Sequence, residues 1–116
     1  MRGINKVILL GNAGKDPEFK TLNDGTTVAR FSLATTDYFT LKNGEAGSKT
    51  EWHTIVAWKS LANLIQKYVR KGSLLYIEGK LSYRQYEDKD GRKMNITEIV
   101  VENIVLLDKK NTGVEE

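Results

Sequence analysis

Two tryptophans, Trp52 and Trp58, are the side chains best suited to bind a flat ligand. They lie in segment 51–58, whose β-branched and aromatic composition is typical of a strand. Because successive side chains of a strand point to opposite faces, both indoles fall on one face and Ile55 and Ala57 fall on the other. An open aromatic face can stack nucleobases of any identity, at roughly 1–3 kcal/mol per base. The same pattern also fits the alternative that both rings fill a hydrophobic core.

The charged residues favour an anionic partner only mildly, because 18 basic and 15 acidic residues leave a net charge of +3. Their distribution along the chain is more informative than the sum. Acidic residues gather at one expected turn (Glu87, Asp88, Asp90) and near the C-terminus. The expected sheet keeps the basic residues Arg2, Lys6, Arg30, Lys80 and Arg84. Such charges usually form only a solvated surface, but the neighbouring aromatics favour contacts to phosphates.

The composition excludes several classes of function. A chain of 116 residues fits one domain, and the absence of cysteine excludes disulfides, thiolate metal sites and cysteine nucleophiles. One histidine and no tight carboxylate cluster beyond Asp88 and Asp90 leave no credible catalytic set, so we expect no enzyme, metal or cofactor. No segment has the ~20 apolar residues of a membrane span, nor a signal peptide. We therefore expect a cytoplasmic protein with no membrane partner.

Five strands and one helix are expected to position the tryptophans. The strands cover residues 5–10, 29–34, 51–58, 74–86 and 96–107. The helix covers residues 61–69, with Ser60 as its N-cap and Gly72 as a left-handed C-terminal cap. Gly79 is expected to mark a bend, and residues 41–49 a long flexible loop.

The order of these elements favours a closed barrel. Long strands without βαβ alternation do not require a parallel sheet, and closure removes the exposed edges of long strands. The predicted fold is mainly β: a five-stranded antiparallel barrel of the oligonucleotide- and oligosaccharide-binding (OB) type, with one α-helix between strands three and four. Trp52, Trp58, Arg84 and Tyr86 would lie on the binding face of such a barrel.

Six short segments of the chain carry a family resemblance. They are NKVILLGN (5–12), GKDPE (14–18), FSLAT (31–35), TEWH (50–53), KGS (71–73) and YIEG (76–79). In this order they resemble bacterial single-stranded DNA-binding proteins over almost all of residues 2–107. The resemblance implies an OB-fold domain over residues 1–107 that assembles into a homotetramer. It also implies that the protein coats single-stranded DNA in replication, recombination and repair.

The resemblance also assigns roles to individual residues. The base-stacking aromatics of the family fall at Phe39, Trp52, Trp58 and Tyr86. Its phosphate-binding cations fall at Arg2, Lys20, Lys71 and Arg84. The chain departs from the family at Phe39 and Tyr86, where many members have tryptophan, and at Trp58, where many have phenylalanine. It also lacks the basic residues that relatives often have at Thr54 and Ser60.

The first strand is apolar on both faces, which is unusual for an antiparallel strand with one face in solvent. We expect the second face to be covered by another copy of the chain, with Val7, Ile8, Leu9 and Leu10 at the subunit interface. The resemblance places His53 near a subunit contact as well. A buried histidine with satisfied hydrogen bonds is the alternative for His53.

Residues 108–116 read as a short flexible tail. Relatives usually carry a longer, glycine-rich extension with an acidic tip, which recruits replication and repair proteins. We expect such partners only for a chain with a longer acidic tail. Two other functions compete with DNA binding: a primosomal accessory protein of related fold, which retention of all four aromatic positions disfavours, and a purely structural barrel with both tryptophans in its core.

Overall fold

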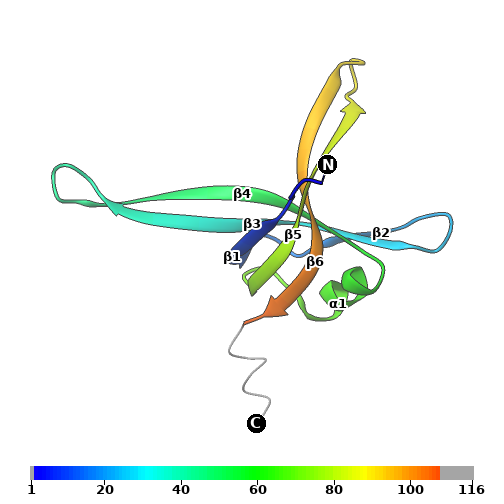
Figure 1. The fold of residues 1–116 in the computed structure, drawn as a ribbon, viewed down its shortest axis with the longest axis horizontal. Coiled ribbons are helices and arrows are strands. Elements are labelled where there is room, and N and C mark those ends of the chain that lie inside the picture. The colour runs from blue at the N-terminus through cyan, green and yellow to red at the C-terminus, as the bar shows by residue number, and fades with distance from the viewer. Residues whose placement is uncertain (1, 108–116) are drawn as a thin grey trace, which may run out of the picture.

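The computed structural model describes residues 2–107 as a strand-rich domain with one helix. Its elements are β1 (Val7–Ala13), β2 (Glu18–Thr21), β3 (Thr27–Thr40), β4 (Ala46–Trp58), α1 (Ser60–Tyr68), β5 (Leu74–Glu87) and β6 (Lys93–Leu106) (Figure 1). Within residues 2–107, no helix is long and apolar enough to cross a membrane. The expected tail, 108–116, lies outside the described residues.

Five of the strands close a barrel. The sheet order is β1-β5-β6-β4-β3-β2, and a further pairing of β1 with β3 joins the two sides. The predicted five-stranded OB-type barrel, with its helix between the third and fourth barrel strands, is thus confirmed. One pairing departs from the antiparallel expectation: β4 and β6 run parallel where Ile55 and Val56 pair with Ile99 and Val100.

The sequence did not predict β2. This four-residue strand pairs only with β3 and lengthens the hairpin at that edge. All four of its residues are exposed, so neither face imposes the apolar alternation that identifies a half-buried strand.

The core lies inside the barrel and follows the predicted alternation. Ala29, Phe31 and Leu33 of β3 are buried, as are Ile55 and Ala57 of β4. Residues of β5 and β6 complete the interior, and α1 contacts β3, β4 and β6 while burying Ala62 and Ile65. Burying a large aliphatic side chain stabilises the fold by roughly 1.5–3 kcal/mol, so the alternating inward residues account for the stability of the barrel.

Both ends of α1 differ from the expected caps. Lys59 is the N-cap residue, with a φ of 59° and no side-chain capping hydrogen bond, so the prediction of Ser60 as the cap is wrong. At the other end, Val69 is extended and its N–H donates to the carbonyl of Ile65. Gly72 does have a left-handed φ of 90°, but in the turn that follows the helix.

The β3–β4 and β5–β6 hairpins extend beyond the barrel as arms, and the shorter β2–β3 hairpin also projects from it (Figure 1). The register of β3 and β4 is continuous from the Val28–Trp58 pair to the Thr40–Ala46 pair, so the prediction of a flexible loop over 41–49 is wrong beyond the turn 41–45. The β5–β6 hairpin likewise continues to the Glu87–Lys93 pair. The outer parts of both arms are mostly exposed. The predicted strands 74–86 and 96–107 nevertheless cover most of the β5–β6 arm, whereas no core face marks the β3–β4 arm in the sequence.

The predicted bend at Gly79 is confirmed as a shift of register between β5 and β6. A Cβ atom at this position would collide with the backbone carbonyl of Val100 on the facing strand. Only glycine therefore allows the two strands to approach closely at the bend.

Candidate nucleic-acid interface

The outer face of the barrel carries a continuous set of side chains across β3, β4 and β6. On β3 and β4, Val28 lies opposite Trp58 and Arg30 lies opposite Val56. Val56 is in turn level with Val100 of β6. Because directly opposed residues share a face of the sheet, the register brings these side chains to one surface.

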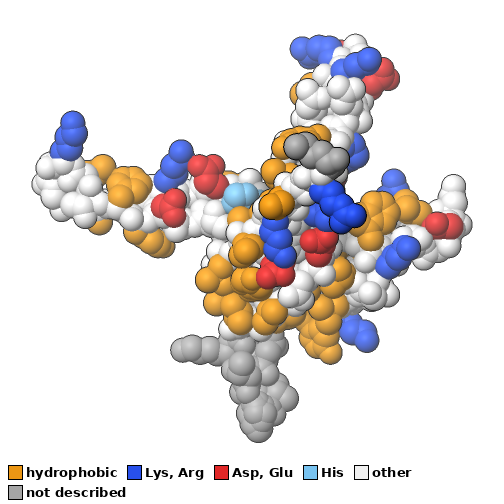
Figure 2. Space-filling model, viewed as in Figure 1, with side chains coloured by type: hydrophobic (Ala, Val, Ile, Leu, Met, Phe, Trp, Pro, Cys, Tyr) orange, Lys and Arg blue, Asp and Glu red, His pale blue; other side chains and the backbone are white. Residues whose placement is uncertain are grey.

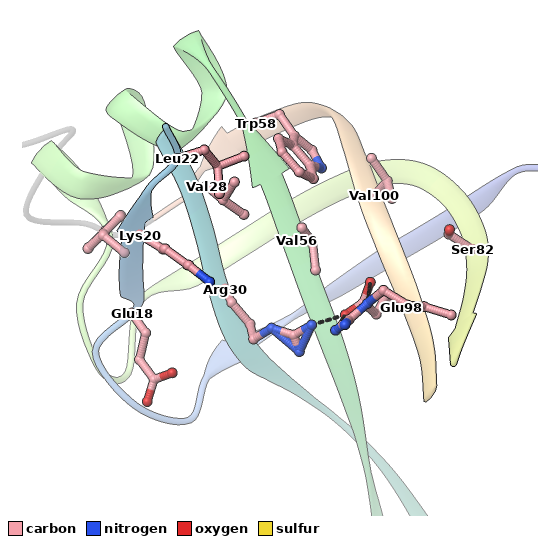
Figure 3. A pocket seen from close by; sticks show the side chains of 12 residues that line it. Glu18, Lys20, Leu22, Val28, Arg30, Val56, Trp58, Ser82, Glu98 and Val100 are labelled. Atoms are coloured by element: carbon pink, nitrogen blue, oxygen red, sulfur yellow. Dashed lines mark hydrogen bonds and ion pairs between the residues drawn. The ribbon is translucent and has the colours of Figure 1, made fainter. Parts of the chain in front are cut away.

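This surface is hollowed into an open pocket of about 700 Å³ (Figure 3), within the size range of ligand-binding clefts. Valine side chains form much of its lining, and Trp58 stands at one side. Its charged residues are Glu18, Lys20, Arg30, Arg84 and Glu98. The pocket thus combines an aromatic ring with three cations, as a site for a base and its phosphates requires.

A buried carboxylate joins two of these cations. Arg84 donates from Nη2 to Oε2 of Glu98 at 2.8 Å, and Arg30 pairs with the same oxygen from Nη2. Burial, and then the charge of the nearby Arg84, lower the pKa of Arg30 from its ordinary value. An arginine titrates so far above neutral pH that the guanidinium group of Arg30 stays charged despite this shift.

Both tryptophans are exposed, so the alternative that they fill the core is wrong. The exposed fraction is 62% for Trp52 and 42% for Trp58, whereas Ile55 and Ala57 between them are fully buried. Trp52 does not line the pocket. Its indole instead lies against Gly14, just after β1, where a Cβ atom would collide with the ring.

Phe39 and Tyr86 lie on the two arms, away from the pocket. Each is 46% exposed. The ring of Phe39 packs against Gly47, its partner on the opposite strand of the arm, and Tyr86 lies opposite Met94 near the end of the other arm. The four aromatics proposed to stack bases are therefore distributed over the barrel and both arms, as a long, flexible ligand would require.

The four cations assigned by resemblance are also distributed. Lys20 and Arg84 line the pocket with Trp58. Arg2 precedes β1 and is exposed. Lys71 lies in the turn between α1 and β5, where its backbone N–H donates to Oδ1 of Asp16 at 2.8 Å. The structure thus brings two of the four together.

Two residues of the pocket were missed as site residues by sequence reasoning. Arg30 was noted only as a basic residue of the sheet, and Glu98 was not singled out. A signal was present for Glu98, because it alternates with the core residues Ile99 and Val101 and so had to lie outside the barrel. Its partners depend on strand order and register, which the sequence does not reveal.

The predicted subunit surface divides between the two faces of β1. Val7 and Leu9 pack against the core, whereas Ile8 and Leu10 are 58% and 57% exposed. Figure 2 shows hydrophobic side chains gathered over the body of the barrel. His53 lies partly buried on β4, where its Nε2 is 2.9 Å from Oγ1 of Thr35, so one hydrogen bond of the histidine is satisfied within the chain.

Comparisons with known proteins agree with this geometry. Residues 4–107 match the model of the single-strand binding protein family. A single-stranded DNA-binding protein of Bacteroides thetaiotaomicron is 51% identical over 114 residues, which cover 95% of this chain and 71% of that protein. Single-stranded DNA-binding protein 1 of Chlorobaculum tepidum is 43% identical over 97% of this chain and 70% of its own length.

A solved structure gives the same result for the fold. The Plasmodium falciparum SSB complex with ssDNA superposes with a TM-score of 0.84 at 38% sequence identity, covering 93% of this chain and 98% of that one. A family match over nearly all the described residues, joined to an OB-type barrel with exposed aromatics and clustered cations, leads to one conclusion: this chain belongs to the single-strand binding protein family.

Proposed function

We propose that this chain binds single-stranded DNA without reading its sequence. The observation that carries the proposal is the pocket, in which Trp58 lies beside Lys20, Arg30 and Arg84 on the outer face of the barrel. The rings stack bases of any identity, and the cations neutralise phosphates and release counterions. Trp52 and the aromatics of the arms provide further stacking positions along the strand.

Duplex DNA is a poor ligand for such a surface. Its paired bases present only their edges in the grooves, so their faces cannot stack on Trp52 or Trp58. The rings therefore select single strands, while the cations add affinity for any polynucleotide.

The biological role that we propose is the coating and protection of single strands during replication, recombination and repair. The bacterial relatives, which are named single-stranded DNA-binding proteins, support this role, and we propose a cytoplasmic, nucleoid-associated location for it. The chain is a binding protein and not an enzyme. We assign DNA binding to residues 1–107, and propose recruitment of replication and repair proteins only for a chain with a longer acidic tail.

Titration with oligothymidylate tests the proposal. We expect strong quenching of tryptophan emission by the single strand, because stacked bases would lie directly on exposed indoles. The affinity should fall as salt rises, since binding releases counterions, and duplex of equal length should produce little quenching. A protein that neither quenches nor binds oligothymidylate at low salt would refute the proposed function.

We further propose that the protein assembles as a homotetramer through the outer face of β1. Exposed Ile8 and Leu10 continue across the sheet to Tyr76 and Val105, because Leu10 pairs with Tyr76 and Tyr76 with Val105. Large apolar side chains aligned on an open face typically mark an interaction surface.

Light scattering should give about four times the chain mass of 13.1 kDa, and the double substitution Ile8→Lys with Leu10→Lys should shift the mass toward that of one chain. A wild-type monomer at micromolar concentration would contradict the assembly.

A further inference from the structure

Glu98 is the one charged residue that the structure buries within residues 2–107, at 6% exposure. A buried carboxylate is strongly unfavourable unless it is paired and hydrogen-bonded. This carboxylate also lines the pocket proposed to hold DNA, where its negative charge alone would repel a phosphate. Its presence on this face therefore needs a physical explanation.

The explanation begins with the geometry of its partners. Arg30 comes from β3 and Glu98 from β6 (Figure 3). Arg84 comes from β5, so three strands converge on one ion cluster. Both arginines donate to the same oxygen, Oε2, and Nε of Arg84 also reaches Oε1 at 3.4 Å. Sharing one acceptor atom holds the two guanidinium groups side by side.

Two guanidinium groups close enough to share one acceptor atom repel each other unless an anion lies between them. Without Glu98 the arginines would separate into solvent, and a ligand would have to gather them at a cost in conformational entropy. With Glu98 they are already in place. Each guanidinium has five N–H donors, and neither makes a further hydrogen bond within residues 2–107 apart from those to Glu98.

The arginine side chains also remain accessible. The exposed fractions of the side chains are 34% for Arg30 and 48% for Arg84, against 7% for the side chain of Glu98. The anion therefore lies beneath the cations, and unused donors are available to the pocket that Trp58 borders.

We propose that Glu98 is a positioning residue that holds Arg30 and Arg84 together as a single site for one backbone phosphate of the strand. The inference rests on the proposed function; it adds Glu98 to the interface and assigns Arg30 and Arg84 to the same phosphate. Paired N–H donors suit a phosphate because they bond two of its oxygens at once. The base next to that phosphate is then placed to stack on Trp58.

The positioning role and the net charge of the pocket predict opposite effects of Glu98→Gln on DNA affinity. Glu98→Gln removes one negative charge from the pocket, which makes its net charge more positive by one, and keeps the shape of the side chain. If only charge mattered, oligothymidylate would bind more tightly and with a steeper salt dependence. If Glu98 positions the arginines, binding becomes weaker, by about threefold to tenfold, because the arginine pair is no longer held in place.

Glu102→Gln is the matched control. Glu102 lies on the same strand and pairs with Lys80 at 3.4 Å, but it is 44% exposed and does not line the pocket. This change removes the same negative charge without affecting the arginines, so affinity should stay equal to the wild type's or rise slightly. Affinities and salt slopes of both variants can be measured by anisotropy of a labelled oligothymidylate.

A double-mutant cycle separates positioning from a general structural effect. Arg84→Gln should weaken binding about tenfold in the native background, the loss expected for one charge-assisted contact. In the Glu98→Gln background the same change should cost about twofold or less, because the arginine pair is already disrupted. Equal losses in both backgrounds would overturn the positioning role.

Arg30→Gln keeps the inference testable if Glu98→Gln fails to fold, because Glu98 then still pairs with Arg84. We expect weaker binding, by about tenfold, and a salt slope reduced by about one. Unchanged affinity would remove Arg30 from the phosphate site. Should the wild type bind oligothymidylate while Glu98→Gln binds as tightly as Glu102→Gln or more tightly, the proposed function would stand and this inference would fall.

Discussion

Replacing both exposed tryptophans with alanine is expected to weaken oligothymidylate binding by roughly 2–6 kcal/mol, from 1–3 kcal/mol for each stacked base. In affinity this is a loss of about thirtyfold or far more. The barrel should remain folded in the double variant of Trp52→Ala and Trp58→Ala. Both rings lie outside the core, while the side chains of Ile55 and Ala57 on the same strand fill it.

The measurement is the anisotropy of a labelled oligothymidylate, since the double variant has lost its own tryptophan signal. Trp52→Phe with Trp58→Phe is the matched control, because phenylalanine keeps a stacking surface and should retain most of the affinity. Tyr68→Ala removes an aromatic of α1 that is 53% exposed and does not line the pocket, and should change binding little. If the double alanine variant bound within twofold of the wild type, stacking on these rings could not be the basis of recognition.

The sequence predicted those parts of the fold where one face is buried. Alternation identified Ala29, Phe31 and Leu33 as inward residues, and all three are buried. The three-and-four spacing likewise identified α1, whose Ile65 is fully buried. In both elements the core dictates residue type at a fixed period.

The β3–β4 arm and β2 escaped prediction for the opposite reason. Residues 46–50 of β4 pair regularly with β3 although hardly any of them face a core. Backbone hydrogen bonds hold such a hairpin, and these place few demands on side-chain type. Residues 41–49 therefore resembled a flexible loop, whereas the structure keeps only a short turn around Gly44, whose φ is 89°.

The candidate site was predictable to a similar extent. The alternation of side chains along β4 correctly placed Trp52 and Trp58 on the face opposite to the core residues. The cluster of Arg30, Arg84 and Glu98 was beyond reach, because Arg30 meets the other two residues only through the parallel pairing of β4 with β6. Contacts across a barrel depend on closure and register rather than on local pattern.

Two glycines three positions apart should respond very differently to the same substitution. A Cβ atom at Gly11 would collide with the backbone carbonyl of Ala34, where β1 meets β3 and closes the barrel. Neither backbone can yield without opening that seam. We therefore expect Gly11→Ala to reduce the free energy of unfolding by about 3 kcal/mol, the upper part of the usual range for overpacking.

At Gly14 the three atoms nearest to an added Cβ atom all belong to the ring of Trp52. Because this indole is exposed, it can rotate away, and Gly14→Ala should leave stability within about 1 kcal/mol of the wild type's. The displaced ring should, however, stack less well, so oligothymidylate affinity should fall, but by less than the roughly 1–3 kcal/mol expected for Trp52→Ala.

Urea denaturation and oligothymidylate anisotropy, applied to both variants, separate the two effects. Gly3→Ala is the control, because a Cβ atom there meets nothing within 4 Å, and it should alter neither measurement. Gly11→Ala should lower stability most, and Gly14→Ala should lower affinity with little loss of stability. If Gly14→Ala bound DNA like the wild type, the position of Trp52 over Gly14 would not matter for stacking, and the ring would have to reach the bases from another orientation.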